Sequence, residues 1–443
     1  MIGRVINGAG RLSRAPGAVV AFVLMAAIVP VVRPLCAQGP DSTWQQHTVA
    51  LEAARARGAW DDVQHHVERL EAITGPNPAY TLNRARVAVH RGDTAAAYTA
   101  LRTFAATGLV RDLATDAALG PLRGTAAWAA IADRMRENAA PRGVPVTVFT
   151  LPDTECIAED LAWDAPRRRW LVSSVRRGAV FAVSPAGAVT TLARVGRPGW
   201  AVLGIAIDAS RKRLWAAAVA LPQAEGYQKG DSGRASIMQF DLAAGRLTHE
   251  FAIPSSVVNA APGDLVIAAN GDLYSGDGRA GAVYRLRDGS DRVELLVPPG
   301  LFRSTQQPVL STDGGTLIVA EYGRGLARVD VATGAVAWVS HPANVSLVGI
   351  DGLIRVGNAL IAVQNLVAPS RVARFTLDAR GAIVGGSVLV QGPSLPEPTH
   401  VALVDGALYA IANAGWDAFD DDGVRKQGVA GLPPRIVRLA LPR

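Results

Sequence analysis

Short apolar runs separated by glycine-containing turns fill the C-terminal two thirds of the chain. The clearest example extends from Leu310 to Ser340, where three apolar-rich runs are divided by the turns Asp313-Gly314-Gly315, Gly323-Arg324-Gly325 and Ala332-Thr333-Gly334. Glycine adopts the positive φ that tight hairpins demand, so the pattern predicts a β meander. An isolated meander buries too little apolar surface, so the pattern also predicts neighbours of the same kind.

The first strand of this unit recurs at intervals of roughly 43 to 60 residues, the spacing typical of four-stranded propeller blades. Its six copies lie at Leu161, Ile205, Leu265, Pro308, Leu353 and Val401. The last copy ends after its third strand, Arg435–Leu441, while an unassigned strand, Val146–Leu151, precedes the first copy. The sequence therefore predicts a mainly β fold, a six-bladed β-propeller closed by pairing Val146–Leu151 with the C-terminal blade.

Residues 44–138 have instead a helical periodicity rich in Ala, Leu, Arg and Glu. Gly58 and Gly92 lie 34 positions apart, the period of a tetratricopeptide helix pair. The segment resembles the tetratricopeptide family, which implies a groove for a peptide; a purely structural appendage is the alternative. Two repeats are too few for independent stability, so we expect them to dock on the propeller. We interpret His47, His65 and His66 as surface histidines, because no carboxylate–His pairing on a helix accompanies them.

The N-terminus has the pattern of an export signal. Arg4, Arg11 and Arg14 precede an apolar run, Ala18–Val32, that is too short to span a bilayer. We predict a signal peptide at 1–37, a helical domain at 38–143 and a propeller at 144–443. The mature protein is then exported, periplasmic or secreted, with no stable membrane insertion after cleavage.

Removing residues 1–37 takes away four arginines and lowers the formal net charge from +7 to about +3. With no stripe of basic and aromatic residues, this charge argues against a nucleic-acid partner. Only Cys156 remains after cleavage, so no internal disulfide forms. We expect a monomer. The G-x-G-x-x-G match at 276–281 is followed by a strand and not a helix, which argues against dinucleotide binding.

Polar residues precede most of the six inner strands and are predicted to meet at one mouth of the channel. These positions are Glu159-Asp160, Gly204, Gly263-Asp264, Gln306-Gln307, Asp351 and His400. Converging carboxylates and amides suit a hard cation such as Ca²⁺ or Mg²⁺. Asp264, Gln307 and His400 are candidates for binding a small-molecule ligand or a protein partner at this mouth; the alternative is that such residues merely cap strands.

Three sequence segments, 158–164, 351–353 and 311–317, resemble the gluconolactonase/regucalcin family. Members of this family are six-bladed propellers and are related to strictosidine-synthase-like proteins. The resemblance implies a divalent cation, Ca, Mg or Zn, and lactone hydrolysis. By position, the metal ligands fall on Glu159, Gln306 and Asp351, and Asp351 is also the candidate catalytic base. Gln306 replaces the family's Asn ligand, and Gly263 replaces an Asn that contacts substrate. Two hypotheses result: an exported ligand- or partner-binding module, and a metal-dependent hydrolase of lactones or related esters.

Overall fold

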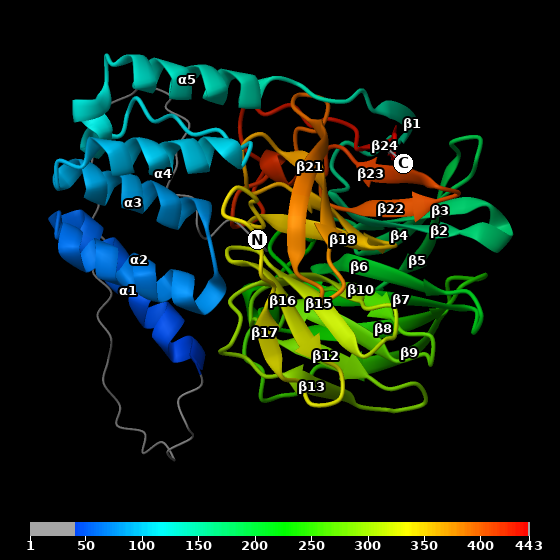
Figure 1. The fold of residues 1–443 in the computed structure, drawn as a ribbon. Coiled ribbons are helices and arrows are strands. Elements are labelled where there is room, and N and C mark those ends of the chain that lie inside the picture. The colour runs from blue at the N-terminus through cyan, green and yellow to red at the C-terminus, as the bar shows by residue number, and fades with distance from the viewer. Residues whose placement is uncertain (1–39, 442–443) are drawn as a thin grey trace.

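The computed structural model describes residues 40–441, so the predicted signal at 1–37 lies outside the described part of the chain. Five helices and one longer 3-10 turn come first, followed by six sheets (Figure 1). Within the described residues, no helix combines the length and apolar character that crossing a membrane would require.

The helical elements are α1 (Pro40–Arg57), α2 (Trp60–Thr74), α3 (Pro78–His90), α4 (Thr94–Ala106), the 3-10 turn η1 (Ala117–Leu122) and α5 (Ala126–Ala139). The first four helices form two consecutive hairpins, α1 with α2 and α3 with α4. Gly58 joins α1 to α2 with a φ of 67° and Gly92 joins α3 to α4 with a φ of 74°, at the two positions where the 34-residue period predicts a turn. Asn77 caps α3 by accepting a hydrogen bond from the backbone N–H of Ala79.

The sheets are six four-stranded antiparallel blades. Blade 1 contains β2 (Ala158–Asp164), β3 (Arg169–Ser174), β4 (Ala179–Val183) and β5 (Val189–Arg194), and blade 2 contains β6 (Trp200–Asp208), β7 (Arg213–Ala220), β8 (Ala235–Asp241) and β9 (Leu247–Ala252). Blade 3 contains β10 (Pro262–Ile267), β11 (Leu273–Asp277), β12 (Val283–Leu286) and β13 (Val293–Val297), and blade 4 contains β14 (Thr305–Leu310), β15 (Thr316–Glu321), β16 (Gly325–Asp330) and β17 (Val336–Trp338). Blade 5 contains β18 (Ile350–Val356), β19 (Ala359–Gln364), β20 (Arg371–Leu377) and β21 (Ile383–Gln391).

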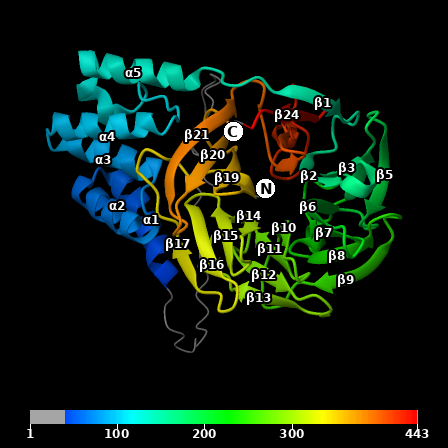
Figure 2. The same ribbon diagram turned by 45° about the vertical axis from the view of Figure 1, so that its right-hand side comes forward.

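Blade 6 closes the ring as predicted. It consists of β22 (Val401–Val404), β23 (Ala407–Ile411), β24 (Arg435–Leu439) and, as its outermost strand, β1 (Val146–Thr150) from before the first blade. Val146 pairs with Arg438 and Thr150 with Arg435. The innermost strands β2, β6, β10, β14, β18 and β22 contact one another in that order around the axis (Figure 2). Apolar clusters between neighbouring blades hold the ring together, as where Leu171 of blade 1 packs with Val202 and Leu214 of blade 2.

The helical segment docks on blades 4 and 5, as its two-repeat length predicts (Figure 2). The backbone N–H of Val110 donates to the carbonyl of Ala368 over 2.7 Å, and the buried Arg371 donates to the carbonyl of Thr107 over 3.2 Å. The guanidinium of Arg324 lies 4.1 Å from the ring centroid of Trp44. These contacts involve the connections β15–β16 and β19–β20, which open on the face where the innermost strands begin.

Candidate functional site

Five of the six innermost strands contain a β-bulge, at equivalent positions in their pairing with the second strand of the blade. The pairing register shifts between Ala158 and Leu161, Val202 and Ile205, Pro262 and Leu265, Thr305 and Pro308, and Ile350 and Leu353. Each bulge places one extra residue on the inner strand, which re-aims the side chains there. The bulged pairs are Glu159-Asp160, Leu203-Gly204, Gly263-Asp264, Gln306-Gln307 and Asp351-Gly352, with His400 directly before β22. We call this set of positions the axial site.

Two glycines let neighbouring inner strands approach closely at the bulges. A Cβ on Gly204 would lie 2.5 Å from the Cα of Asp264, and a Cβ on Gly352 would lie 2.8 Å from the Cα of His400. Real Cβ atoms essentially never come so close to another atom. Gly204 and Gly352 are therefore required by packing, and they bring the polar residues of adjacent blades together.

Three predicted metal ligands are each held by a neighbouring side chain. The Oε2 atom of Glu159 accepts a 2.6 Å hydrogen bond from the indole N–H of Trp416. The Oδ2 atom of Asp351 accepts one of 2.6 Å from the amide of Asn365. The amide of Gln306 donates over 2.9 Å to Ser304. Within residues 40–441, these hydrogen bonds leave one further oxygen on each of Glu159, Gln306 and Asp351 without a hydrogen bond.

A second group, Asp160, Asp264 and His400, gathers at the neighbouring positions of the inner strands. Their metal-binding atoms all lie within 4.8 Å of one another, and all three side chains are buried. The Nε2 atom of His400 is 3.0 Å from Oδ1 of Asp160, and Oδ2 of Asp160 accepts the backbone N–H of Ile205 over 2.7 Å. Asp160 is therefore engaged in structural contacts between blades. The sequence placed it beside Glu159 without assigning it a role.

Gln307, predicted as a ligand-binding residue, donates through its amide to the carbonyls of Pro308 at 3.0 Å and Leu265 at 3.3 Å. Its Oε1 atom is buried and has no hydrogen-bond partner among the described residues. Gln307 thus keeps an unused acceptor beside the group of Asp160, Asp264 and His400. An unsatisfied buried acceptor is costly, and a bound donor would remove that cost.

The electrostatics of the axial site follow from gathering four carboxyl groups and one imidazole in a desolvated place. Burial, followed by the charge of Asp351, raises the pKa of Glu159 well above its usual value. Burial likewise raises the pKa of Asp264. Burial also raises the pKa of Asp351 to about 7, although the hydrogen bond from Asn365 acts to lower it. Burial alone would lower the pKa of His400, but Asp160, Asp264 and Asp351 together raise it to about 9. The site is short of positive charge.

The residues that hold the predicted ligands were missed by the sequence analysis. Trp416 lies in a short 3-10 turn, η4 (Trp416–Ala418), and Asn365 follows β19; Asn365 in turn accepts a 2.5 Å hydrogen bond from the hydroxyl of Tyr322. All three lie in connections between second and third strands. These connections differ in length and sequence from blade to blade, so no repeating signal marks them.

No family model matches the chain, and no curated protein matches it. Among solved structures, a gluconolactonase from Xanthomonas campestris is similar at 16% identity and a TM-score of 0.46, over 68% of this chain and 95% of that one. Regucalcin from Agrobacterium tumefaciens, described as a calcium-binding protein, is similar at 17% identity and a TM-score of 0.45, over 68% of this chain and 94% of that one. A virginiamycin B lyase from Staphylococcus aureus is similar at 14% identity and a TM-score of 0.45, over 66% of this chain and 97% of that one.

The similar structures thus include a gluconolactonase and a regucalcin. The six-bladed fold itself is defined by the strand pairing of this chain. At so low an identity, any assignment of function has to come from this chain's own residues.

Proposed function

We propose that the axial site binds a divalent cation through Glu159, Gln306 and Asp351, and that the protein is a metal-dependent hydrolase of lactones or related esters. The observation that carries the proposal is the shared geometry of the three side chains. Each comes from an equivalent bulge, each is fixed by a neighbouring polar group, and each retains an oxygen for a ligand. Carboxylate and amide oxygens with this support suit Ca²⁺ or Mg²⁺.

A cation bound there would polarise a substrate carbonyl and lower the pKa of a bound water. Asp351 would also be the general base that accepts a proton from such a water. Asn365 donates to its Oδ2 atom and leaves Oδ1 without a hydrogen bond among the described residues. Trp416 fixes the carboxylate of Glu159 in the same way. At Gly263 the nearest atom to an added Cβ would be the carbonyl oxygen of Gly276, at 3.9 Å. Within residues 40–441, no side chain therefore covers the backbone of blade 3 at the position where we expect substrate to approach.

A binding module without catalysis is the second candidate. It is favoured by the first bulge position of blades 2 and 3, where Leu203 and Gly263 offer no polar side chain and leave the cation fewer protein ligands on that side. The docked helical segment, with its contacts at Thr107 and Val110 on the same face of the propeller, would then contribute to holding a ligand or a protein partner.

Calorimetric titration with Ca²⁺ and Mg²⁺, followed by assays on a panel of lactones and aryl esters, separates the two candidates. We expect one equivalent of cation to bind, and Asp351→Ala to lose both cation affinity and turnover. Asp313→Ala, which alters an exposed turn carboxylate in blade 4, is the matched control and should retain both. If the wild-type protein binds a cation but turns over no lactone or ester, the hydrolase is excluded and the binding module is the remaining candidate. If it neither binds a cation nor turns over a substrate, the proposal of a metal site is wrong.

Export is part of the same proposal. If the segment before Gln38 is a cleaved signal, N-terminal sequencing of the protein recovered from its host's secreted or periplasmic fraction will begin at Gln38. An uncleaved Met1 in that fraction, or recovery from the cytoplasm alone, would contradict it.

A further inference from the structure

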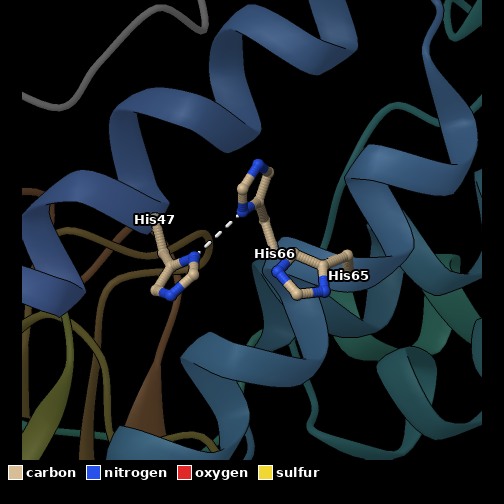
Figure 3. A group of neighbouring side chains, drawn as sticks. All are labelled: His47, His65 and His66. Atoms are coloured by element: carbon tan, nitrogen blue, oxygen red, sulfur yellow. Dashed lines mark hydrogen bonds between the residues drawn. The ribbon is translucent and has the colours of Figure 1, made fainter.

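Three histidines meet on the first helical hairpin, far from the innermost strands of the propeller. His47 lies on α1, and His65 and His66 are adjacent on α2 (Figure 3). Their metal-binding nitrogens all lie within 4.8 Å of one another. From the sequence we interpreted these residues as surface histidines, and packing of α1 against α2 brings them together. We call them the histidine cluster.

The contacts within the cluster show that its imidazoles share a single space. Nδ1 of His47 and Nδ1 of His66 are 2.9 Å apart. Two N–H groups cannot face each other at this distance, so one nitrogen donates and the other offers its lone pair. Burial, then the neighbouring His66 and Arg69, lowers the pKa of His47; burial, then His65, lowers that of His66, with Asp62 opposing. Neutral imidazole is the form that binds metals.

The ring spacing fits a common metal centre. The ring centroids are 5.9 Å apart for His47 and His65, 5.2 Å for His47 and His66, and 5.2 Å for His65 and His66. Imidazole binds Zn²⁺ with Zn–N bonds of about 2.0–2.1 Å, so tetrahedral coordination separates the ligand nitrogens by roughly 3.3 Å and the ring centroids by roughly 5.2 Å. The observed triangle is close to this arrangement, and small side-chain rotations would complete it.

We propose that His47, His65 and His66 form a binding site for a Zn²⁺-class transition-metal ion, with three imidazole nitrogens as ligands and the fourth position open to water. Nitrogen donors select Zn²⁺, Co²⁺ or Ni²⁺ over Ca²⁺ and Mg²⁺. His65 is exposed and the other two are half-buried, so an ion can reach the cluster directly from solvent. The site is separate from the axial oxygens and does not depend on the proposed hydrolase.

A metal in the cluster would link the two helices of the hairpin. α1 is the helix that carries Trp44, which stacks on the buried Arg324 of blade 4. Trp44 lies one helical turn before His47, so the ion would fix the helix that docks on the propeller. Because binding requires α1 and α2 to be packed together, metal binding is coupled to the stability of the hairpin.

Titration of metal-stripped protein with Co²⁺ and then Zn²⁺ tests the site. The full chain carrying Asp351→Ala is used, so that the axial oxygens do not contribute. We expect one equivalent of Co²⁺ with the visible absorption of a four-coordinate ion, displaced by Zn²⁺, and a Zn²⁺-dependent rise in Tm. His47→Ala and His65→Ala should each lower Zn²⁺ affinity at least about tenfold and remove the rise in Tm.

His249→Ala is the matched control, because His249 is an exposed histidine on β9 outside the cluster; it should bind Co²⁺ and Zn²⁺ as the parent does. His65 is exposed, so its replacement preserves the fold even if that of His47 does not, and the helical circular dichroism of both variants checks this. Unchanged affinity in His65→Ala, an equal loss in His249→Ala, or no Co²⁺ spectrum in the parent would each overturn the site. None of these outcomes bears on Ca²⁺ binding by the wild type.

Discussion

The axial site and the histidine cluster both gather metal-binding atoms, but they are built in different ways. The axial site takes oxygen donors from the bulges of separate blades, where Glu159, Gln306 and Asp351 occupy equivalent backbone positions. The histidine cluster takes nitrogen donors from two neighbouring helices, α1 and α2. The first is specified by a repeated backbone and the second by the packing of one helix on another. Oxygen and nitrogen donors suit different metal ions, so removing the ligands of one site should leave metal binding at the other site unchanged.

One turn of blade 4 contacts both regions. Tyr322 donates to Asn365, which holds Asp351 of the axial site. Two residues later, Arg324 stacks under Trp44 of α1, one helical turn before His47. The β15–β16 turn therefore connects the two sites through side-chain contacts, and substitutions in this turn test how far the sites are independent.

Arg324→Ala should have the largest effect on stability, because it breaks the contact between α1 and the propeller. Arg324 is 2% exposed and pairs with Glu321, which is 1% exposed, at 3.3 Å. Its removal leaves the carboxylate of Glu321 buried without its cation, which costs roughly 3–5 kcal/mol in the free energy of unfolding. Urea denaturation followed by circular dichroism measures the loss.

Arg328→Ala is the control for this substitution. Arg328 lies four residues further on, on β16, and is exposed; it donates to the carbonyl of Arg380, so its loss should cost less than about 0.5 kcal/mol. Equal stability of the two variants would show that the helical segment and blade 4 are not held together through Arg324.

The different construction of the two sites explains what the sequence could predict. Six apolar repeats and an unpaired strand at Val146 were enough for the blade number and the ring closure, because each blade repeats the same local pattern. The same repeats placed Glu159, Gln306 and Asp351 at one position of the inner strands, and Asp264 and His400 at the next position. Their assigned roles as ligands or base stay predictions.

What the sequence did not reveal depends on contacts between unlike segments. Trp416 and Asn365 lie in connections of irregular length, and each acts on a residue of a different strand, Glu159 and Asp351 respectively. His47 and His66 are 19 positions apart and meet only because the Gly58 turn folds α2 back on α1. Spacing along one helix, the criterion applied to these histidines, does not detect ligands contributed by two helices.

His400→Gln should disturb the axial site alone and in a pH-dependent way. Asp160, Asp264 and Asp351 raise the pKa of His400 from 6.5 to about 9. A raised folded-state pKa gives stability that is fully present below pH 6.5 and lost as pH rises through about 9. The wild type should exceed His400→Gln by on the order of 2–3 kcal/mol at the acidic end of this window, and the difference should shrink toward its basic end.

Denaturant titrations of both proteins across this pH range measure the difference. The Co²⁺ spectrum of the histidine cluster should be the same in His400→Gln, since the substitution lies in the other region. A stability difference that stays constant with pH would mean that His400 contributes by packing and not by its charge.

Gly204→Ala and Gly263→Ala compare two bulge glycines of the axial site that differ in the space available to an added Cβ. The added Cβ would lie 2.5 Å from the Cα of Asp264 in the first case and 3.9 Å from the carbonyl oxygen of Gly276 in the second. Overpacking at Gly204 should cost about 1–3 kcal/mol. Gly263→Ala should be neutral or slightly stabilising, because it removes freedom from the unfolded chain. Thermal denaturation ranks the two, and equal losses would contradict the close approach of the inner strands.

Tyr322→Phe should have the smallest effect, and it tests whether the shared turn of blade 4 influences the axial site. The substitution keeps the ring and removes only the O–H that donates to Asn365. Asn365 still donates to the carbonyl of Pro398 over 2.9 Å, so it should remain near Asp351 with less restraint. We expect a roughly two- to fivefold loss of Ca²⁺ affinity with a stability change of about 1 kcal/mol or less. Tyr409→Phe removes a hydroxyl from a ring that packs on Trp170 and should leave Ca²⁺ affinity unchanged. If the two variants bind Ca²⁺ equally well, Asn365 holds Asp351 without help from Tyr322, and the turn is a structural contact between the regions and not a functional one.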